Sequence, residues 1–303
     1  MFEKITYHGW SHCYRLSSDE VELIVTGDVG PRVIHCGFIG DVNEFGTFEE
    51  HLGKSGGTEW RMYGGHRLWH APEDAVRTYY PDNEPVRVVE EGGTLRAIQP
   101  PETTTGIQKE IALTFKAANQ IEVRHYLRNV GLWPVELAPW ALSVMAPGGI
   151  GIVPQPRPTS TGGLLPNRTV ALWPYTDMAD TRFHWGSQFI LLRQDEQAQT
   201  PVKIGLSARE SWIAYLHRDH LFLKTVEYVE GATYPDLGCS LEMYTNNRML
   251  ELETLGPLRM VNPQETIEHV EHWFLFRGVK VEGEDEDAIA EAVLPLVAAA
   301  KNI

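Results

Sequence analysis

Residues 238–246 place a carboxylate in the middle of a predicted strand. They read Gly-Cys-Ser-Leu-Glu-Met-Tyr-Thr-Asn, a short β pattern with turn residues on either side. Because side chains alternate along a strand, Glu242 shares a face with Ser240 and Tyr244, and Leu241 points the opposite way. A sugar has hydroxyl groups that need hydrogen-bond acceptors and C–H faces that pack on aromatic rings. This face therefore suits a sugar.

A second concentration of functional groups lies in the long connection formed by residues 38–84. Within residues 58–73 it contains two Trp, two His, two Arg and a Gly pair. These residues present planar rings and hydrogen-bonding tips on a backbone that bends sharply. We predict substrate contacts here, and the residues chosen are Arg61, Arg67, Trp69 and His70. The alternative is that the aromatic rings only plug one end of the fold.

His66 and His70 are four residues apart, a spacing that forms a metal face on a helix. Gly64, Gly65 and Pro72 argue against a helix at this point. The cysteines lie elsewhere in the chain. We therefore expect no metal and no cofactor.

The segment 238–243 resembles the C-terminal Gly-x-x-Leu-Glu-Thr segment of the aldose 1-epimerases, or galactose mutarotases. This resemblance implies that Glu242 is the catalytic base. Residues 231–257 resemble more closely an uncharacterised bacterial family with the mutarotase-like fold (DUF4380), and that likeness extends from about residue 30 to residue 278. The implied fold is the galactose mutarotase-like supersandwich.

Residues 136–143 stand where the epimerases have an Asn-His-x-Tyr-Phe strand. If the registers correspond, Trp140 replaces the histidine that those enzymes use as general acid. A tryptophan ring stacks on a sugar but cannot protonate its ring oxygen. We therefore choose His66 as the acid and expect Trp140 and Tyr244 to contact the substrate.

The pattern of short strands predicts an all-β protein, a large antiparallel β-sandwich with a short C-terminal helix. We expect a single domain over residues 1–303, with the helix at about residues 285–301. The acidic run 284–287 precedes the helix, where negative charge suits the helix dipole. A second long connection, residues 153–186, is rich in Pro and aromatic residues and is predicted to form a rim of the pocket.

Lys224 lies on the same face of its predicted strand as two apolar residues, and a lysine is seldom buried without a partner. Since neighbouring strands usually pair, we predict that Lys224 lies beside Glu242 and favours its ionised form. The alternative is that the Lys224 side chain reaches solvent at the sheet margin. Glu251 and Glu253 also share a face, which we interpret as an ordinary polar face.

The net charge of −15 argues against nucleic acid and anionic membranes as partners. The three cysteines do not have the number or spacing of disulfide pairs or of metal ligands. This favours a reducing location, the cytoplasm. Neither end of the sequence contains a long apolar run, so the sequence predicts neither a signal peptide nor a membrane-spanning helix. The expected partner is a small sugar or sugar derivative, and the oligomeric state stays open.

Three functions fit these observations. The first is an aldose 1-epimerase-like isomerase, in which Glu242 removes the anomeric proton and His66 protonates the ring oxygen. The second is a carbohydrate-binding protein without catalysis, as Trp140 suggests. The third is a structural or regulatory domain with a protein partner. We rank them in this order, because concentrated aromatic and polar loop residues suit a small ligand.

Overall fold

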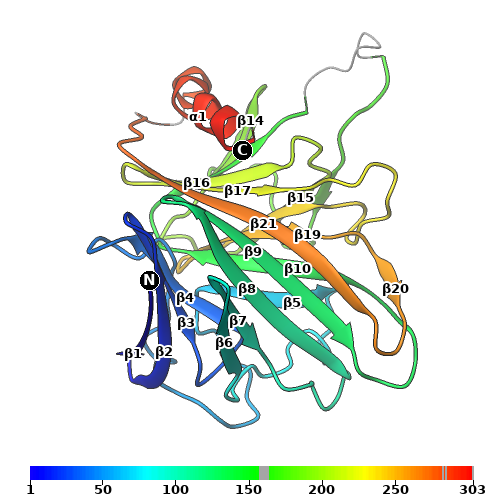
Figure 1. Cartoon of the computed structure of the whole chain (residues 1–303). Helices are drawn as coiled ribbons and strands as arrows, with labels where there is room; N and C mark the ends of the chain where they lie inside the picture. Colours follow the sequence, from blue (N-terminus) through cyan, green and yellow to red (C-terminus); the bar gives the residue numbers. More distant parts are fainter. Residues whose placement is uncertain (157–163, 282, 284, 302–303) are drawn as a thin grey trace.

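The structure is a computed structural model that describes residues 1–156, 164–281, 283 and 285–301. Two large antiparallel sheets pack face to face and enclose the main apolar core (Figure 1). The predicted antiparallel β-sandwich is therefore confirmed. Residues 157–163 of the second long connection, and Glu284 of the acidic run, lie outside the described residues.

One sheet has 11 strands. They are β1 (Phe2–Tyr7), β2 (Trp10–Ser17), β3 (Val21–Thr26), β4 (Arg32–Phe38), β5 (His66–Ala71), β10 (Val135–Met145), β12 (Val170–Leu172), β15 (Val202–Leu206), β18 (Leu241–Thr245), β19 (Leu250–Leu255) and β20 (Arg259–Val261). Their order is β1-β2-β3-β4-β5-β10-β19-β18-β15-β12, and β20 pairs with β10. The strand that carries Glu242, β18, thus lies between β19 and β15.

The other sheet has 10 strands. They are β6 (Arg87–Glu91), β7 (Thr94–Ile98), β8 (Ile107–Ala117), β9 (Gln120–Asn129), β11 (Ile150–Pro154), β13 (Phe183–Trp185), β14 (Phe189–Arg193), β16 (Trp212–His217), β17 (His220–Val226) and β21 (Thr266–Arg277). Their order is β13-β14-β11-β16-β17-β21-β9-β8-β7-β6.

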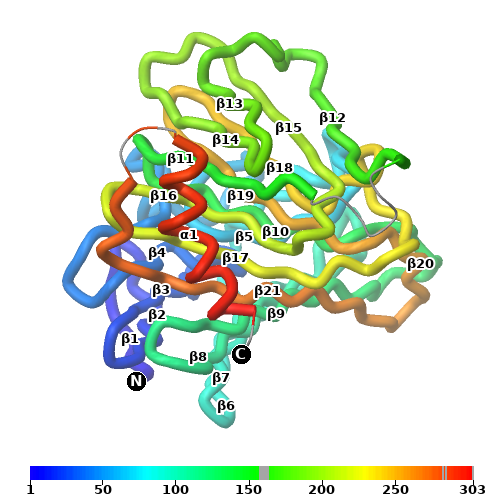
Figure 2. Tube along the Cα trace, turned by 90° about the horizontal axis from the view of Figure 1, so that it is seen from above, coloured from blue at the N-terminus to red at the C-terminus, as the bar shows by residue number. Residues whose placement is uncertain are grey.

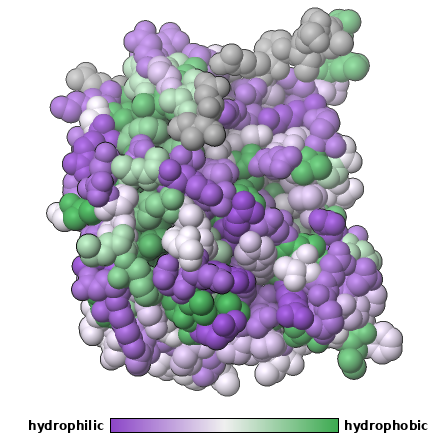
Figure 3. Space-filling view, viewed as in Figure 1, coloured by the Kyte–Doolittle hydropathy of each residue, from purple (hydrophilic) through white to green (hydrophobic). Residues whose placement is uncertain are grey.

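Helix α1 (Glu286–Lys301) confirms the predicted C-terminal helix. Its buried residues pack with side chains of β11, β14, β16 and β17 in a second apolar cluster, so it covers the outer face of the 10-stranded sheet. Figure 2 shows α1 crossing over these strands. The Glu286 carboxylate accepts hydrogen bonds from the backbone N–H groups of Ser187, Gln188 and Phe189, which attaches the start of the helix to β14. Hydrophilic and hydrophobic residues are interspersed over the face shown in Figure 3.

Strand β5 lies inside the connection that the sequence pattern assigned entirely to a loop, and that assignment is wrong. Gly64 and Gly65 lead into it with φ angles of 91° and 70°, a backbone conformation that glycine adopts easily. A Cβ atom on Gly65 would lie 2.3 Å from the carbonyl oxygen of Val33, so a larger residue does not fit there. Both faces of β5 are buried, which removes the polar and apolar alternation that reveals a half-exposed strand.

Side chains of the 11-stranded sheet alternate between the core and its outer face. On β18, Leu241 and Met243 belong to the main core, and Glu242 and Tyr244 point to the outer face, as the sequence pattern predicts. On β5, Leu68 belongs to the core and Trp69 to a separate apolar cluster. The outer face of this sheet is therefore where the candidate residues gather.

Candidate functional site

A cavity of about 380 Å³ opens on the outer face of the 11-stranded sheet. It is lined by Trp60, Met62, Arg67, Trp69, Glu73, Tyr79, Trp140, Leu142, Trp173, Tyr175, Pro201, Lys203, Tyr244, Met249 and Glu251. Both long connections contribute aromatic rings to it. Trp60, Trp69 and Tyr79 come from the first connection and Trp173 and Tyr175 from the second, so the two connections meet at this cavity.

The register between β5 and β10 sets the aromatic wall of the cavity. Trp140 lies opposite Trp69, and Leu142 lies opposite Arg67. The Trp69 and Trp140 rings meet edge to face with centroids 5.2 Å apart, and Tyr79 meets Trp69 in the same way at 5.1 Å. Such contacts fix the ring orientations, so the wall is largely formed before a ligand arrives.

Lys203 forms part of the cavity floor and pairs with two carboxyl groups behind it. Its Nζ atom lies 2.7 Å from Glu242 Oε2 and 2.8 Å from Glu253 Oε2. The same ammonium lies 4.7 Å from the ring centroid of Trp140 and 4.6 Å from that of Trp173. Glu242 is fully buried, so Lys203 separates it from the cavity.

Burial dominates the titration of this cluster. It raises the pKa of Glu242 well above its ordinary value, and Glu253 adds to this effect while Lys203 opposes it. Burial alone would lower the pKa of Lys203, but Glu242 and Glu253 outweigh it and hold that pKa well above its ordinary value. Lys203 thus stays charged, and Glu242 has an increased affinity for a proton.

Arg67 and Glu251 form a second buried ion pair beside the first. Arg67 Nη2 donates to Glu251 Oε1 at 2.9 Å, and the guanidinium lies 4.4 Å from the ring centroid of Trp69. Burial raises the pKa of Glu251, and Arg67 opposes this shift. The interpretation of Glu251 and Glu253 as an ordinary polar face is wrong, because both are buried at the site.

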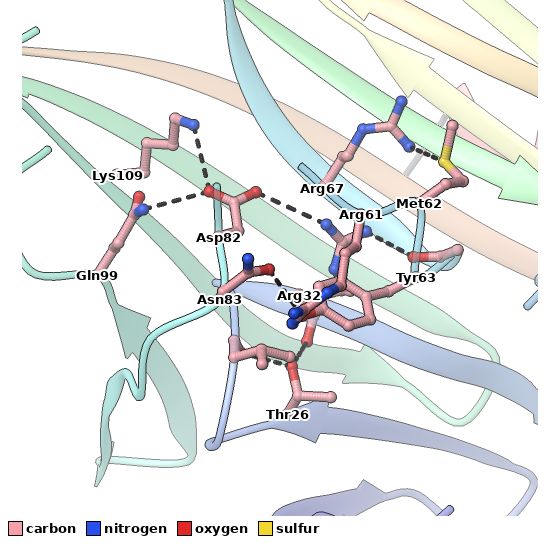
Figure 4. Close-up of polar contacts among 12 residues, drawn as sticks. Thr26, Arg32, Arg61, Met62, Tyr63, Arg67, Asp82, Asn83, Gln99 and Lys109 are labelled. Atoms are coloured by element: carbon pink, nitrogen blue, oxygen red, sulfur yellow. Dashed lines mark hydrogen bonds and ion pairs between the residues drawn. The ribbon is translucent and has the colours of Figure 1, made fainter. Parts of the chain in front are cut away.

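A partly buried polar network, shown in Figure 4, fixes the segment that carries Arg61. Arg61 Nη1 donates to the carbonyl oxygen of Gly56 at 2.8 Å and to Tyr63 Oη at 3.3 Å. Tyr63 Oη donates to Asn83 Oδ1 at 2.7 Å. The Arg61 guanidinium therefore holds the loop together, and Arg61 is not among the residues that line the cavity.

His66 points to the opposite face of β5, into the core. Its Nε2 atom is 2.7 Å from His125 Nε2, and its Nδ1 atom is 2.8 Å from Ser143 Oγ. His125 Nδ1 donates to the carbonyl oxygen of His269, so His125 Nε2 accepts from His66 and Ser143 donates to His66. Burial, with Lys224 nearby, holds the pKa of His66 well below its ordinary value, so the ring is neutral. The structure does not bring His66 and Glu242 together on one face.

His70 shares the inward face with His66, and its Nε2 atom lies 3.6 Å from Glu102 Oε2. Neither histidine lines the cavity. His66, His125 and Glu271 place potential metal-ligand atoms within 4.8 Å of one another. The two imidazole rings already use these nitrogen atoms in a mutual hydrogen bond, and the Lys224 ammonium lies 2.9 Å from Glu271. A positive neighbour opposes a bound cation, so we assign no metal to this group.

The predicted pairing of Lys224 with Glu242 is wrong. Lys224 lies on β17 of the 10-stranded sheet, and Glu242 lies on β18 of the 11-stranded sheet. The chain crosses from one sheet to the other between these two strands, so adjacency in sequence does not make them neighbours. Lys224 pairs with Glu271 and is fully buried, so the alternative that it reaches solvent is also wrong.

Several site residues were missed by the sequence reasoning. They are Trp60, Glu73, Tyr79, Trp173, Tyr175, Lys203 and Glu251. Lys203 left a usable signal, because it is the charged residue in the otherwise apolar strand Val-Lys-Ile-Gly-Leu. A buried lysine needs carboxylate partners, but the pairing of β15 with β18 that supplies Glu242 is not readable from local patterns.

No protein-family model matches the chain, and no curated protein matches it at a significant level. Solved structures are similar in fold. The Slr1438 protein from Synechocystis is 11% identical with a TM-score of 0.57, over 91% of this chain and 99% of that one. A galactose mutarotase-like protein from Lactobacillus casei is 8% identical with a TM-score of 0.55, over 87% and 100%. A galactose mutarotase related enzyme from Lactobacillus acidophilus is 8% identical with a TM-score of 0.52, over 88% and 98%.

These identities are low, so the likeness shows the fold alone. The chain has the galactose mutarotase-like fold. In the described part of the chain, no helix has the length and apolar character needed to cross a membrane.

Proposed function

We propose that this protein is a carbohydrate-active protein that binds a sugar in the cavity on the outer face of the 11-stranded sheet. The observation that carries the proposal is the composition of the cavity wall. Trp, Tyr and apolar side chains supply flat surfaces for the C–H faces of a sugar, and Arg67, Glu73, Lys203 and Glu251 supply hydrogen-bonding groups. A volume of about 380 Å³ lies within the range of small-molecule sites.

Calorimetry and thermal shift with a panel of monosaccharides test this proposal. A sugar that binds only the folded state raises the midpoint of unfolding in proportion to occupancy. We expect saturable binding of at least one sugar, and we expect Tyr175→Ala to weaken it. No binding across aldoses, amino sugars and acidic sugars would contradict the proposal and favour the third function, a domain with a protein partner.

Interconversion of sugar anomers is the second candidate function. Ring opening needs a base for the anomeric hydroxyl group and an acid for the ring oxygen. Glu251 and Lys203 both line the cavity, and burial raises the proton affinity of Glu251. In this candidate Lys203 donates a hydrogen bond to the ring oxygen and stabilises the negative charge that develops there, and the base is Glu251 or, if Lys203 moves aside, Glu242. The solved structures named as mutarotase-like proteins support the same reaction by analogy of fold.

Two broader proposals accompany this function. We propose that residues 1–303 form one domain, because the main apolar core combines residues from both sheets, from Leu16 to Leu275. A single cooperative unfolding transition is the expected result. We also propose kinship with the bacterial DUF4380 family, which rests on the resemblance of residues 231–257.

A further inference from the structure

The cavity and its floor hold more carboxyl groups than cations among the described residues. Glu73 and Glu251 line the cavity, and Glu242 and Glu253 lie directly behind Lys203. Asp236, half-buried, is close enough to this group to interact with Lys203, Glu242, Glu253 and Glu73. The cations that balance these acids are Arg67 and Lys203. Carboxyl groups therefore outnumber cations here, and Glu73 is the exposed one, outside the ion pairs that Arg67 and Lys203 form.

Both cations are already committed to groups of the protein. Arg67 is bonded to Glu251 and lies over the ring of Trp69. Lys203 is held by two carboxylates and lies over the rings of Trp140 and Trp173. A phosphate or carboxylate on the ligand would have to displace one of these buried ion pairs. The carboxylates that remain would then repel it. The site therefore discriminates against acidic sugars.

The cavity wall also presents aromatic rings beside an exposed acid, Glu73. Glu73 is exposed at the cavity rim and accepts a hydrogen bond from Tyr79 Oη. Trp60 packs edge to face on Tyr79 with ring centroids 5.3 Å apart. Tyr175 and Tyr244 contribute further rings. Aromatic faces with a nearby carboxylate attract cations through the ring quadrupole and through charge.

We infer that the preferred ligand of this cavity is an amino sugar, in which a protonated amine replaces one hydroxyl group. This inference rests on the proposed function and adds the charge of the substrate to it. The sugar ring packs on the aromatic wall, and the ammonium group lies near Glu73 and the adjoining rings. Neutral sugars fill the same space without the charge interaction.

The decisive experiment compares sugars that differ only at one carbon. Calorimetry at low salt and pH 6 is run with D-glucosamine, D-glucose and N-acetyl-D-glucosamine, and with the matching galactose and mannose series. We expect one amino sugar to bind about tenfold more tightly than its parent and its N-acetyl derivative. We expect this preference to shrink as salt rises, because salt screens the charge interaction at the rim.

The outcomes separate the two proposals. Equal or tighter binding of the neutral parents, or tight binding of a uronic acid or sugar phosphate, overturns the amino-sugar inference and leaves sugar binding intact. No binding of any sugar overturns both.

A charge-removing variant tests the role of Glu73. Glu73 is exposed, so we expect Glu73→Gln to keep the fold, and circular dichroism checks this. We expect the variant to lose much more affinity for the amino sugar than for the parent sugar, so that most of the preference for the amino sugar disappears. The matched control is Glu196→Gln, an exposed acid that does not line the cavity. An equal loss of affinity for both sugars would show that Glu73 acts as a hydrogen-bond acceptor only, and would overturn the inference.

Discussion

Lys203 Nζ lies 2.7 Å from Glu242 Oε2, so an ammonium group on strand β15 covers the carboxylate that the sequence singles out on strand β18. Both side chains point to the outer face of the 11-stranded sheet, where register pairs Lys203 with Tyr244 and Gly205 with Glu242. A Cβ atom on Gly205 would lie 2.6 Å from Cys239 Sγ and 3.2 Å from the Trp173 ring, so a larger residue does not fit there. The strand pairing therefore creates the ion pair at the base of the cavity.

Removal of Lys203 should destabilise the protein. Lys203→Met leaves Glu242 and Glu253 buried without their common cation, and breaking such a pair costs about 3–5 kcal/mol. Urea denaturation at pH 7, followed by circular dichroism, measures the free energy of unfolding. The control Lys54→Met changes an exposed residue and should alter that free energy by less than about 0.5 kcal/mol. A loss below about 1 kcal/mol in Lys203→Met would contradict the importance of the pair.

The raised pKa of Glu242 predicts how stability depends on pH. The folded state keeps the Glu242 proton at pH values where the unfolded chain, with an ordinary pKa of about 4.3, has lost it. The contribution of Glu242 to wild-type stability therefore falls as pH rises above about 4.3, until the folded-state pKa of Glu242 is reached. Glu242→Gln removes this dependence, so its stability relative to wild type should increase from pH 4 to pH 7. The exposed control Glu49→Gln should show no such trend. If the stability difference between Glu242→Gln and wild type does not change with pH, the raised pKa of Glu242 is contradicted.

Lys224 should act on Glu271 instead of Glu242. Burial alone would raise the pKa of Glu271, but the adjacent Lys224 holds it well below its ordinary value. This stabilisation is present above the unfolded pKa of about 4.3 and is lost as pH falls through the folded pKa. Lys224→Met should therefore cost about 3–5 kcal/mol at pH 7 and less near pH 4. Denaturation curves across this range measure the trend, and a loss that grows toward low pH would count against it.

The fold was predictable because it depends on local patterns. Alternation along residues 238–244 places Glu242 outside and Leu241 inside, and the structure agrees. The acidic start and apolar periodicity of the last segment predict the helix, which packs through Ile289 and Val293.

The site was only partly predictable, since it is assembled by pairings between distant strands. Strand β5 carries Arg67 and Trp69 on one face and His66 on the other, and both faces are buried, so no polar pattern shows which one meets the ligand. Lys203 and Lys224 are both buried lysines in apolar strands. The order of strands in each sheet decides which carboxylates pair with them. Adjacency in sequence suggested Glu242 as the partner of Lys224, and that partner is wrong.

Sugar binding should depend on the aromatic rings at the mouth of the cavity. Tyr175 is 45% exposed and lines the cavity, so its removal leaves the core unchanged. Tyr175→Ala should weaken sugar affinity about fivefold, which corresponds to about 1 kcal/mol of ring contact. Calorimetry with the best sugar of the panel measures the change. The control Tyr126→Ala lies on β9 of the other sheet and should bind as wild type does; equal losses in both variants would place the sugar elsewhere.

Catalysis and binding can be separated by experiment. If the protein interconverts sugar anomers, polarimetry on a freshly dissolved α-sugar should show a rate above the buffer background. Glu251→Gln keeps the shape of the side chain and removes the base, so it should slow the reaction by about 100 to 10,000-fold while calorimetry shows little change in sugar affinity. Glu242→Gln is tested beside it. A loss confined to Glu242→Gln would mean that Lys203 moves aside and that the resemblance to the epimerases identified the base correctly.

His66→Asn decides which residue is the acid. His66 is bonded to His125 and Ser143 in the core, on the face of β5 opposite the cavity. We therefore expect the variant to lose about 1–3 kcal/mol of stability and, where it remains folded, to keep the wild-type rate. A large loss of rate in a stable variant with unchanged affinity would support the sequence-based assignment of His66 as the acid. Sugar binding with no rate above background in the wild type would leave a carbohydrate-binding protein, because a cavity that holds the sugar without a working acid and base cannot open its ring.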